Sequence, residues 1–123
     1  MSRKRILIVE DEQEFADMVK LRLELEEFIC DTAHTTDEGI KAIYTALYDL
    51  IILDLMMPGG GGFSILEKMQ QNLNKPRIPV IILTGKAINA EVKALIGRYQ
   101  VNAVFSKPYD PEDFIFKVKE LAR

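Results

Sequence analysis

Cysteine, tryptophan, histidine and long apolar runs are scarce or absent in this sequence of 123 residues. The single cysteine, Cys30, has no partner in the chain, so an internal disulfide is excluded and a reducing, cytoplasmic setting is expected. Basic residues are not in excess, because 16 Lys and Arg against 19 Asp and Glu give a formal net charge of -3. Without clustered positive charge, direct binding to nucleic acid is not expected.

No apolar run is long enough for a signal peptide or a membrane span. The basic cluster at residues 3–5 is followed only by the short run Ile6 to Val9 before acidic residues begin at Glu10. No linker, internal repeat or low-complexity segment interrupts the chain. A single domain over residues 1–123 with no membrane association is therefore predicted.

Five short apolar segments are predicted to be β-strands. Three of them are continuously apolar, as expected of parallel strands that are covered by helices on both faces. The segments are residues 6–9, 28–30, 50–53, 80–83 and 103–105.

Five stripes of apolar residues, spaced three or four apart, alternate with these segments and predict amphipathic helices. They are Phe15, Val19 and Leu23; Ile40, Ile43 and Leu47; Phe63, Leu66, Met69 and Leu73; Val92, Ile96 and Tyr99; and Phe114, Val118 and Leu121. Thr35 and Asp110 are typical helix N-caps. The alternation predicts an α/β fold, a (βα)5 doubly wound five-stranded parallel sheet, for which we expect the flavodoxin-like strand order 2-1-3-4-5.

Polar residues follow four of the predicted strands at the point where each strand ends. Glu10 and Asp11 follow the first strand, Asp54 the third, Thr84 the fourth and Lys107 the fifth. In a sheet of this kind these ends lie at one edge. Three carboxylates brought together repel unless a cation intervenes, and a set of oxygen ligands without Cys or His favours Mg²⁺.

This set contains a candidate for each part of phosphoryl transfer to a carboxylate. Asp54 is the best nucleophile, because it directly follows the most buried-looking strand and opens a loop. Glu10 and Asp11 are better metal ligands, while Thr84 and Lys107 suit the phosphoryl oxygens. Each residue alone has an ordinary structural explanation, such as an acidic pair at a helix N-terminus, so it is their joint occurrence that indicates a site.

Four segments of the chain resemble the receiver domain of response regulators, the phospho-acceptor domain of two-component systems. They are ILIVEDE at residues 6–12, DLMMPG at 54–59, TG at 84–85 and KP at 107–108. The resemblance implies that Asp54 accepts a phosphoryl group from a histidine kinase or a histidine phosphotransfer protein. It implies a signalling domain rather than an enzyme, which takes part only in its own phosphorylation and autodephosphorylation.

The resemblance also assigns the ligands of the cofactor Mg²⁺. They would be Glu10, Asp11, Asp54 and the backbone carbonyl of Met56, while Thr84 and Lys107 would bind the phosphoryl oxygens. The peptide bond between Lys107 and Pro108 is often cis in this family. The output would be an effector domain or a downstream protein. Homodimerisation on activation is possible in such a domain. The sequence leaves open whether the chain stands alone or is part of a longer regulator.

The chain departs from the family pattern at Val104, where an aromatic switch residue is usual. Phe105 is expected on the opposite face of its strand and cannot replace that residue. Switching would then depend on Thr84 and residues 85–89 as one two-state element. Met56 and Lys86 would flank the path of the hydrolytic water.

Three other interpretations can be weighed. A haloacid-dehalogenase phosphatase needs a second Asp at the position of Met56, and a flavodoxin-like cofactor binder would not place three acids beside a phosphate. The serious alternative is a receiver-like interaction module that works without phosphorylation, which Val104 favours.

Two further features are not assigned to the site. The glycines at 59–62 lack the Gly-Lys-Ser/Thr ending of a P-loop and indicate a flexible loop. His34 is expected to be exposed and not catalytic.

Overall fold

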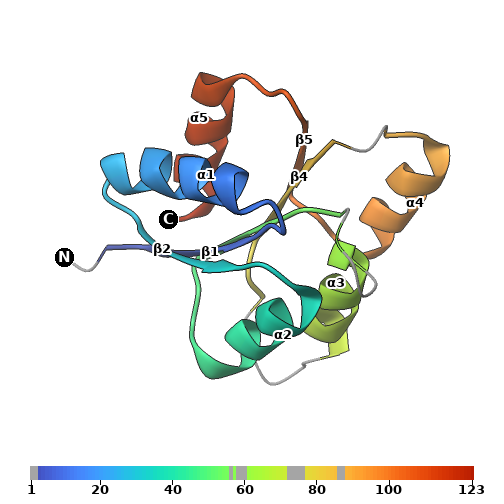
Figure 1. Cartoon of the computed structure of the whole chain (residues 1–123). Coiled ribbons are helices and arrows are strands. Elements are labelled where there is room, and N and C mark those ends of the chain that lie inside the picture. Colours follow the sequence, from blue (N-terminus) through green and yellow to red (C-terminus); the bar gives the residue numbers. More distant parts are fainter. Residues whose placement is uncertain (1–2, 56, 58–60, 72–76, 86–87) are drawn as a thin grey trace.

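A computed structural model of the chain describes residues 3–55, 57, 61–71, 77–85 and 88–123 (Figure 1). Strands and helices alternate along it as predicted. They are β1 (Arg5–Val9), α1 (Gln13–Leu25), β2 (Ile29–Ala33), α2 (Thr36–Thr45), β3 (Leu50–Leu53), α3 (Gly61–Gln71), β4 (Val80–Thr84), α4 (Ala90–Arg98), β5 (Ala103–Ser106) and α5 (Pro111–Leu121). In the part of the chain that is described, no helix has the length and hydropathy of a membrane span.

The five strands form one parallel sheet in the order β2-β1-β3-β4-β5, which confirms the predicted topology. Helices α1 and α5 cover one face, and α2, α3 and α4 cover the other (Figure 1). Alternate residues of each central strand enter the two cores: Ile6 and Ile8 pack toward α1 and α5, whereas Leu7 and Val9 pack toward α2 and α3. Every residue of β3 and β4 is buried, as continuously apolar strands require.

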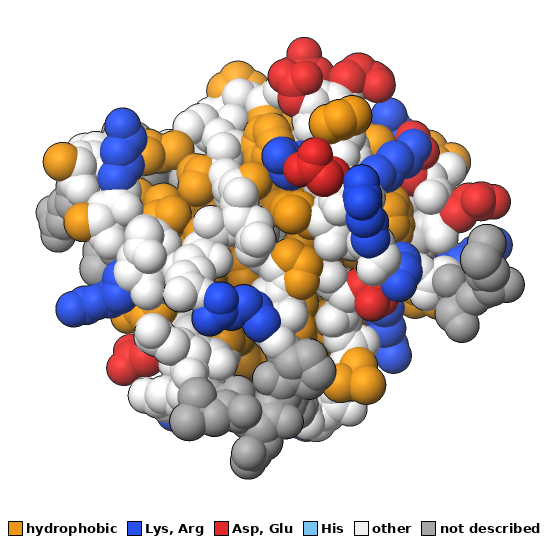
Figure 2. All heavy atoms as spheres, turned by 180° about the vertical axis from the view of Figure 1, so that it is seen from behind, with side chains coloured by type: hydrophobic (Ala, Val, Ile, Leu, Met, Phe, Trp, Pro, Cys, Tyr) orange, Lys and Arg blue, Asp and Glu red, His pale blue; other side chains and the backbone are white. Residues whose placement is uncertain are grey.

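The second strand extends beyond its predicted segment, to Ala33. Asp31 and Thr32 are polar, and they are tolerated because β2 is an edge strand whose residues there are only half-buried. Cys30 is buried, and this burial raises the pKa of its thiol to about 12, so it is an unreactive core residue. From behind, the apolar side chains at the surface are interrupted by charged and other side chains (Figure 2).

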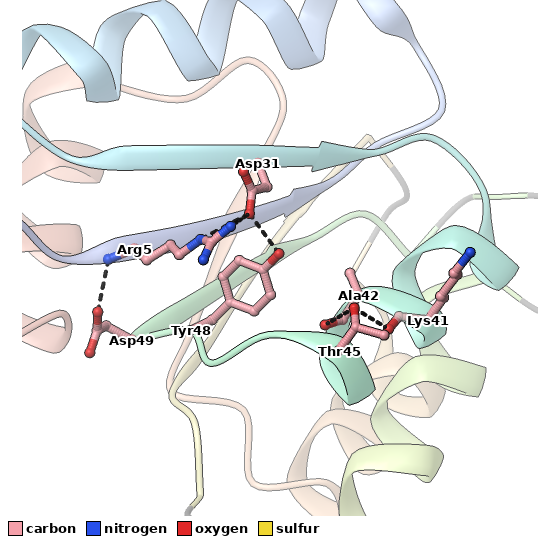
Figure 3. A network of polar contacts seen from close by, with 7 residues as sticks. All are labelled: Arg5, Asp31, Lys41, Ala42, Thr45, Tyr48 and Asp49. Atoms are coloured by element: carbon pink, nitrogen blue, oxygen red, sulfur yellow. Dashed lines mark hydrogen bonds and ion pairs between the residues drawn. The ribbon is translucent and has the colours of Figure 1, made fainter.

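Polar side chains join the first three strands at the edge of the sheet where the strands begin (Figure 3). Asp31 accepts hydrogen bonds from Arg5 at 3.0 Å and from the hydroxyl of Tyr48 at 2.8 Å, and Asp49 accepts from the backbone N–H of Arg5 at 2.8 Å. Burial, together with the hydrogen bond to Asp31, raises the pKa of Tyr48 to about 12. Tyr48 therefore remains a donor, and the network joins the start of β1 to β2 and to the residues that precede β3.

The predicted helix caps are also present. Thr35 accepts a hydrogen bond from the backbone N–H of Glu38 at 3.1 Å, and Asp110 accepts from two backbone N–H groups of α5. Asn89 caps α4 in the same way, accepting from Val92 at 2.9 Å.

Gly61 and Gly62 bring the start of α3 against the end of β3. Gly61 has a φ of +63°, and a Cβ atom there would collide with the backbone oxygen of Leu55. A Cβ atom on Gly62 would lie 2.7 Å from the backbone oxygen of Asp54. The expectation of a flexible loop was therefore wrong for these two glycines, which are buried first residues of α3 and are required for this close approach. Residues 59–60 lie outside the described part of the chain.

Gly62→Ala should lower the free energy of unfolding by more than about 1 kcal/mol, because the added methyl group meets a fixed carbonyl. Gly97→Ala is the matched control: a Cβ atom there meets nothing within 4 Å, and alanine should stabilise α4 by about 0.5 to 1 kcal/mol. Urea unfolding of both variants measures the difference. Equal changes in the two variants would contradict the close approach at Gly62.

Candidate functional site

The predicted acidic residues meet at the edge of the sheet where the strands end. Glu10 and Asp11 directly follow β1, and Asp54 directly follows β3, which pairs with β1. One carboxylate oxygen from each of the three residues lies within 4.8 Å of the others. Glu10 and Asp54 are buried, whereas Asp11 is exposed, so the cluster is open to solvent on one side.

Lys107 brings a positive charge into this acidic cluster. Its Nζ atom lies 2.5 Å from Oε1 of Glu10 and 3.5 Å from Oδ2 of Asp54. The backbone N–H of Lys107 donates to the carbonyl of Thr84 at 2.8 Å, which attaches the lysine to the end of β4. The peptide bond between Lys107 and Pro108 is cis.

Thr84 is the last residue of β4 and is fully buried. It pairs with Ser106 across the sheet, one residue before Lys107. Its position places a hydroxyl group at the same edge as the acidic cluster and the lysine. All five residues that the sequence predicted for this edge of the sheet therefore lie there. Met56, the remaining predicted ligand, and Lys86 lie outside the described residues.

Crowding changes the protonation of Glu10. Burial raises the pKa of its carboxyl group to about 7, and the negative charge of Asp54 adds to this effect. Hydrogen bonds from Lys107 and from the backbone N–H of Glu12 oppose the rise without cancelling it. Burial tends to lower the pKa of Lys107, but its contacts with Glu10 and Asp54 outweigh this, and the lysine stays charged.

The donor set fits a hard divalent cation. The three grouped ligands are carboxylates, two of them buried and close enough to repel each other, and a cation would relieve that repulsion. With the positive charge of Lys107 beside the carboxylates, the same edge of the sheet could bind a tetrahedral oxyanion. The arrangement therefore combines three grouped carboxylates, whose oxygens fit the ligands that a divalent cation prefers, with the positive charge of Lys107.

His34 was expected to be exposed, and this expectation was wrong. It is half-buried, and its Nδ1 atom lies 3.0 Å from the backbone oxygen of Glu10. The contact arises because β1 and β2 are paired in register up to Val9 and Ala33, so the residues that follow them are neighbours. A spacing of 24 positions in the sequence gave no signal of it.

The aromatic residues around β5 lie as the strand alternation predicts. Val104 is half-buried and packs against the core on the face that α2, α3 and α4 cover, whereas Phe105 packs on the other face, with its ring centroid 5.6 Å from that of Phe114. An aromatic contact that the sequence did not indicate joins this face to the site: Nζ of Lys107 lies 4.2 Å from the ring centroid of Phe15. Phe15 was assigned only to an apolar stripe.

Known proteins resemble this chain over nearly its whole length. A family model described as response regulator receiver domain matches residues 6–119. The regulatory protein VanR of Enterococcus faecium is 37% identical over 120 residues, which cover 97% of this chain and 50% of VanR. The response regulator ArlR of Staphylococcus aureus is 34% identical over 119 residues, or 97% of this chain and 52% of ArlR. The chain thus spans about half the length of these curated relatives.

Solved structures show the same fold. A CheY-like response regulator receiver domain protein from Methanospirillum hungatei superposes with a TM-score of 0.89 at 30% identity, covering 98% of this chain and 94% of that one. The response regulator TrrA of Thermotoga maritima, solved in complex with Mg(2+)-BeF, has a TM-score of 0.81 at 28% identity and covers 96% of this chain and 98% of that one.

The raised pKa of Glu10 predicts a pH dependence of stability in metal-free protein. Because the folded-state pKa of about 7 exceeds the ordinary value of 4.5, the protonated carboxyl stabilises the fold below about pH 4.5, and this contribution is lost as the pH rises through 7. With EDTA present, the unfolding free energy of wild type relative to Glu10→Gln should fall by on the order of 1 to 3 kcal/mol across that range.

Urea unfolding at closely spaced pH values measures this difference. Glu14→Gln, which changes an exposed acid in the first turn of α1, is the control and should show no comparable dependence. A difference between wild type and Glu10→Gln that stays constant with pH would contradict the raised pKa.

Proposed function

Since the chain belongs to the response regulator receiver domain family, the signalling domain of two-component systems, we propose that Asp54 accepts a phosphoryl group from a phosphohistidine. The donor would be a histidine kinase or a histidine phosphotransfer protein. The observation that carries the proposal is the meeting of Glu10, Asp11 and Asp54 with Lys107 at one edge of the sheet. The domain would act only in its own phosphorylation and autodephosphorylation.

The transfer forms one bond and breaks one. An oxygen of the Asp54 carboxylate attacks the phosphorus atom, the bond from phosphorus to the histidine nitrogen breaks, and the electron pair returns to the imidazole ring. Asp54 is suited to this role because it directly follows a fully buried strand and is held at the edge of the sheet. Its backbone N–H donates to the carbonyl of Val9 at 3.0 Å.

The proposed cofactor is Mg²⁺, and its ligands would be Glu10, Asp11, Asp54 and the backbone carbonyl of Met56, which lies outside the described residues. When bound, the ion would neutralise charge on the phosphoryl oxygens and the carboxylates. Support comes from the oxygen-only donor set and from the Mg(2+)-BeF complex of the TrrA protein. Glu10 must lose its proton to take part, so ion binding should be weaker below about pH 7.

Lys107 and Thr84 would receive the phosphoryl oxygens. The ammonium group of Lys107 already lies 3.5 Å from Asp54, and its main chain is hydrogen-bonded to Thr84. A movement of Thr84 or of Lys107 would therefore displace the other residue, and with it the end of β4 or the end of β5. We propose that this coupling, together with residues 85–89, forms the switch in place of an aromatic residue at Val104.

The phosphorylated state would be read by a part of the signalling system outside this domain. Because the curated relatives are about twice as long as this chain, an effector domain or a downstream protein would read the phosphorylated state. Homodimerisation on activation is a further route for the same signal. The single cysteine favours a reducing, cytoplasmic setting for this exchange.

Incubation with phosphoramidate and Mg²⁺ should add the mass of one phosphoryl group to wild type and none to Asp54→Asn. The measurement is intact mass spectrometry. The matched control is Asp49→Asn, which changes an aspartate at the opposite edge of the sheet and should be modified as wild type is.

A wild-type chain that gains no phosphoryl mass would contradict the phospho-acceptor function. It would favour an interaction module that works without phosphorylation, the alternative that Val104 supports. Equal modification of Asp54→Asn and wild type would place the acceptor elsewhere.

A further inference from the structure

The ring of Phe15 lies against the ammonium group of Lys107, in a position to which the proposed phosphoryl transfer assigns no role. Phe15 is in the first turn of α1, directly after the loop that carries the acidic pair. The Nζ atom of Lys107 lies 4.2 Å from the ring centroid, well within the range of a cation–π interaction. The Lys107 side chain is only 18% exposed, and such contacts strengthen as the cation is withdrawn from water.

The Phe15 ring is itself held in place by other aromatic rings. Its centroid lies 6.3 Å from that of Tyr109, at an interplanar angle of 84°, an edge-to-face arrangement that aromatic pairs prefer. Tyr109 in turn packs against Phe114 at 5.0 Å, in the core between the sheet and α5. The ring that faces Lys107 is therefore anchored to the core.

The other contacts of Lys107 involve the groups that the proposed reaction would use. Its ammonium is paired with Glu10 and Asp54, but Glu10 is a proposed metal ligand and Asp54 the proposed acceptor. A metal ion and a phosphoryl group would compete with Lys107 for both carboxylates. The face of the Phe15 ring carries partial negative charge without binding metal or phosphate, so its attraction for the ammonium remains.

We propose that Phe15 is a positioning residue that keeps the Lys107 ammonium at the phosphoryl site by a cation–π interaction. Its effect on phosphoryl binding rests on the proposed function. The contact itself does not, because it exists in the unphosphorylated, metal-free chain and can be measured there.

The first measurement is the NMR shift of the Lys107 ε-methylene protons in metal-free protein. Protons over the face of an aromatic ring are shifted upfield, so wild type and Phe15→Tyr should show this shift and Phe15→Leu should lose it. Phe116→Leu is the matched control, since Phe116 is 68% exposed on α5, and it should leave the shift unchanged. An unshifted signal in wild type would overturn the proposal.

The second measurement is the affinity for beryllofluoride, a phosphoryl analogue, in the presence of Mg²⁺. Mono-, di- and trifluorophenylalanine at position 15 keep the ring but withdraw electrons from its face stepwise. The dissociation constant should rise with each fluorine, by about two- to tenfold over the series, with Phe15→Leu at the weak end. Phe15→Tyr should restore near wild-type affinity, and Phe116→Leu should match wild type.

The two measurements separate the possible failures. Equal affinity across the fluorinated series, with the upfield shift present, would mean that the ring only packs against the lysine, and the proposal would fail while the phospho-acceptor function stands. If wild type binds no beryllofluoride with Mg²⁺, the proposed function fails and the positioning role fails with it. A loss of affinity that does not follow the number of fluorines would also overturn the proposal.

Discussion

Repulsion among the carboxylates of Glu10, Asp11 and Asp54 is the constraint on which the site depends. Two of them are buried, and one oxygen from each lies within 4.8 Å of the others. The chain offsets this charge in two ways, by the proton that Glu10 retains up to about pH 7 and by the ammonium group of Lys107. A metal ion would take the place of the proton, so ion binding and proton release from Glu10 would be coupled, while Lys107 would remain at the site.

The fold brings these groups together, and its alternating elements and strand order could be predicted from the sequence. Short, continuously apolar segments that alternate with amphipathic stripes are typical of parallel strands covered on both faces. Such strands place their ends at one side of the sheet, so the convergence of Asp54 with the acidic pair followed from the sequence. The second strand was predicted too short because Asp31 and Thr32 are polar, and only its place at the edge of the sheet explains them.

Contacts between residues far apart in the sequence were not predictable from pattern. The contact of His34 with the backbone of Glu10 depends on the register of two strands. That of Phe15 with Lys107 depends on how the first turn of α1 meets the residue that follows β5. A glycine likewise does not reveal which carbonyl it approaches, as at Gly62. Val104 packs on the other face of the sheet. The rings of Phe15, Tyr109 and Phe114 therefore connect the site to α1 and α5 on the face where an aromatic residue at position 104 would not lie.

The position of the phosphorylated residue can be determined chemically. After phosphorylation with phosphoramidate and Mg²⁺, borohydride reduces an aspartyl phosphate to homoserine, which peptide sequencing by mass spectrometry places along the chain. Homoserine is expected at position 54 alone, and none when EDTA is present. Homoserine at another aspartate, or none in the presence of Mg²⁺, would show that Asp54 is not the Mg²⁺-dependent acceptor.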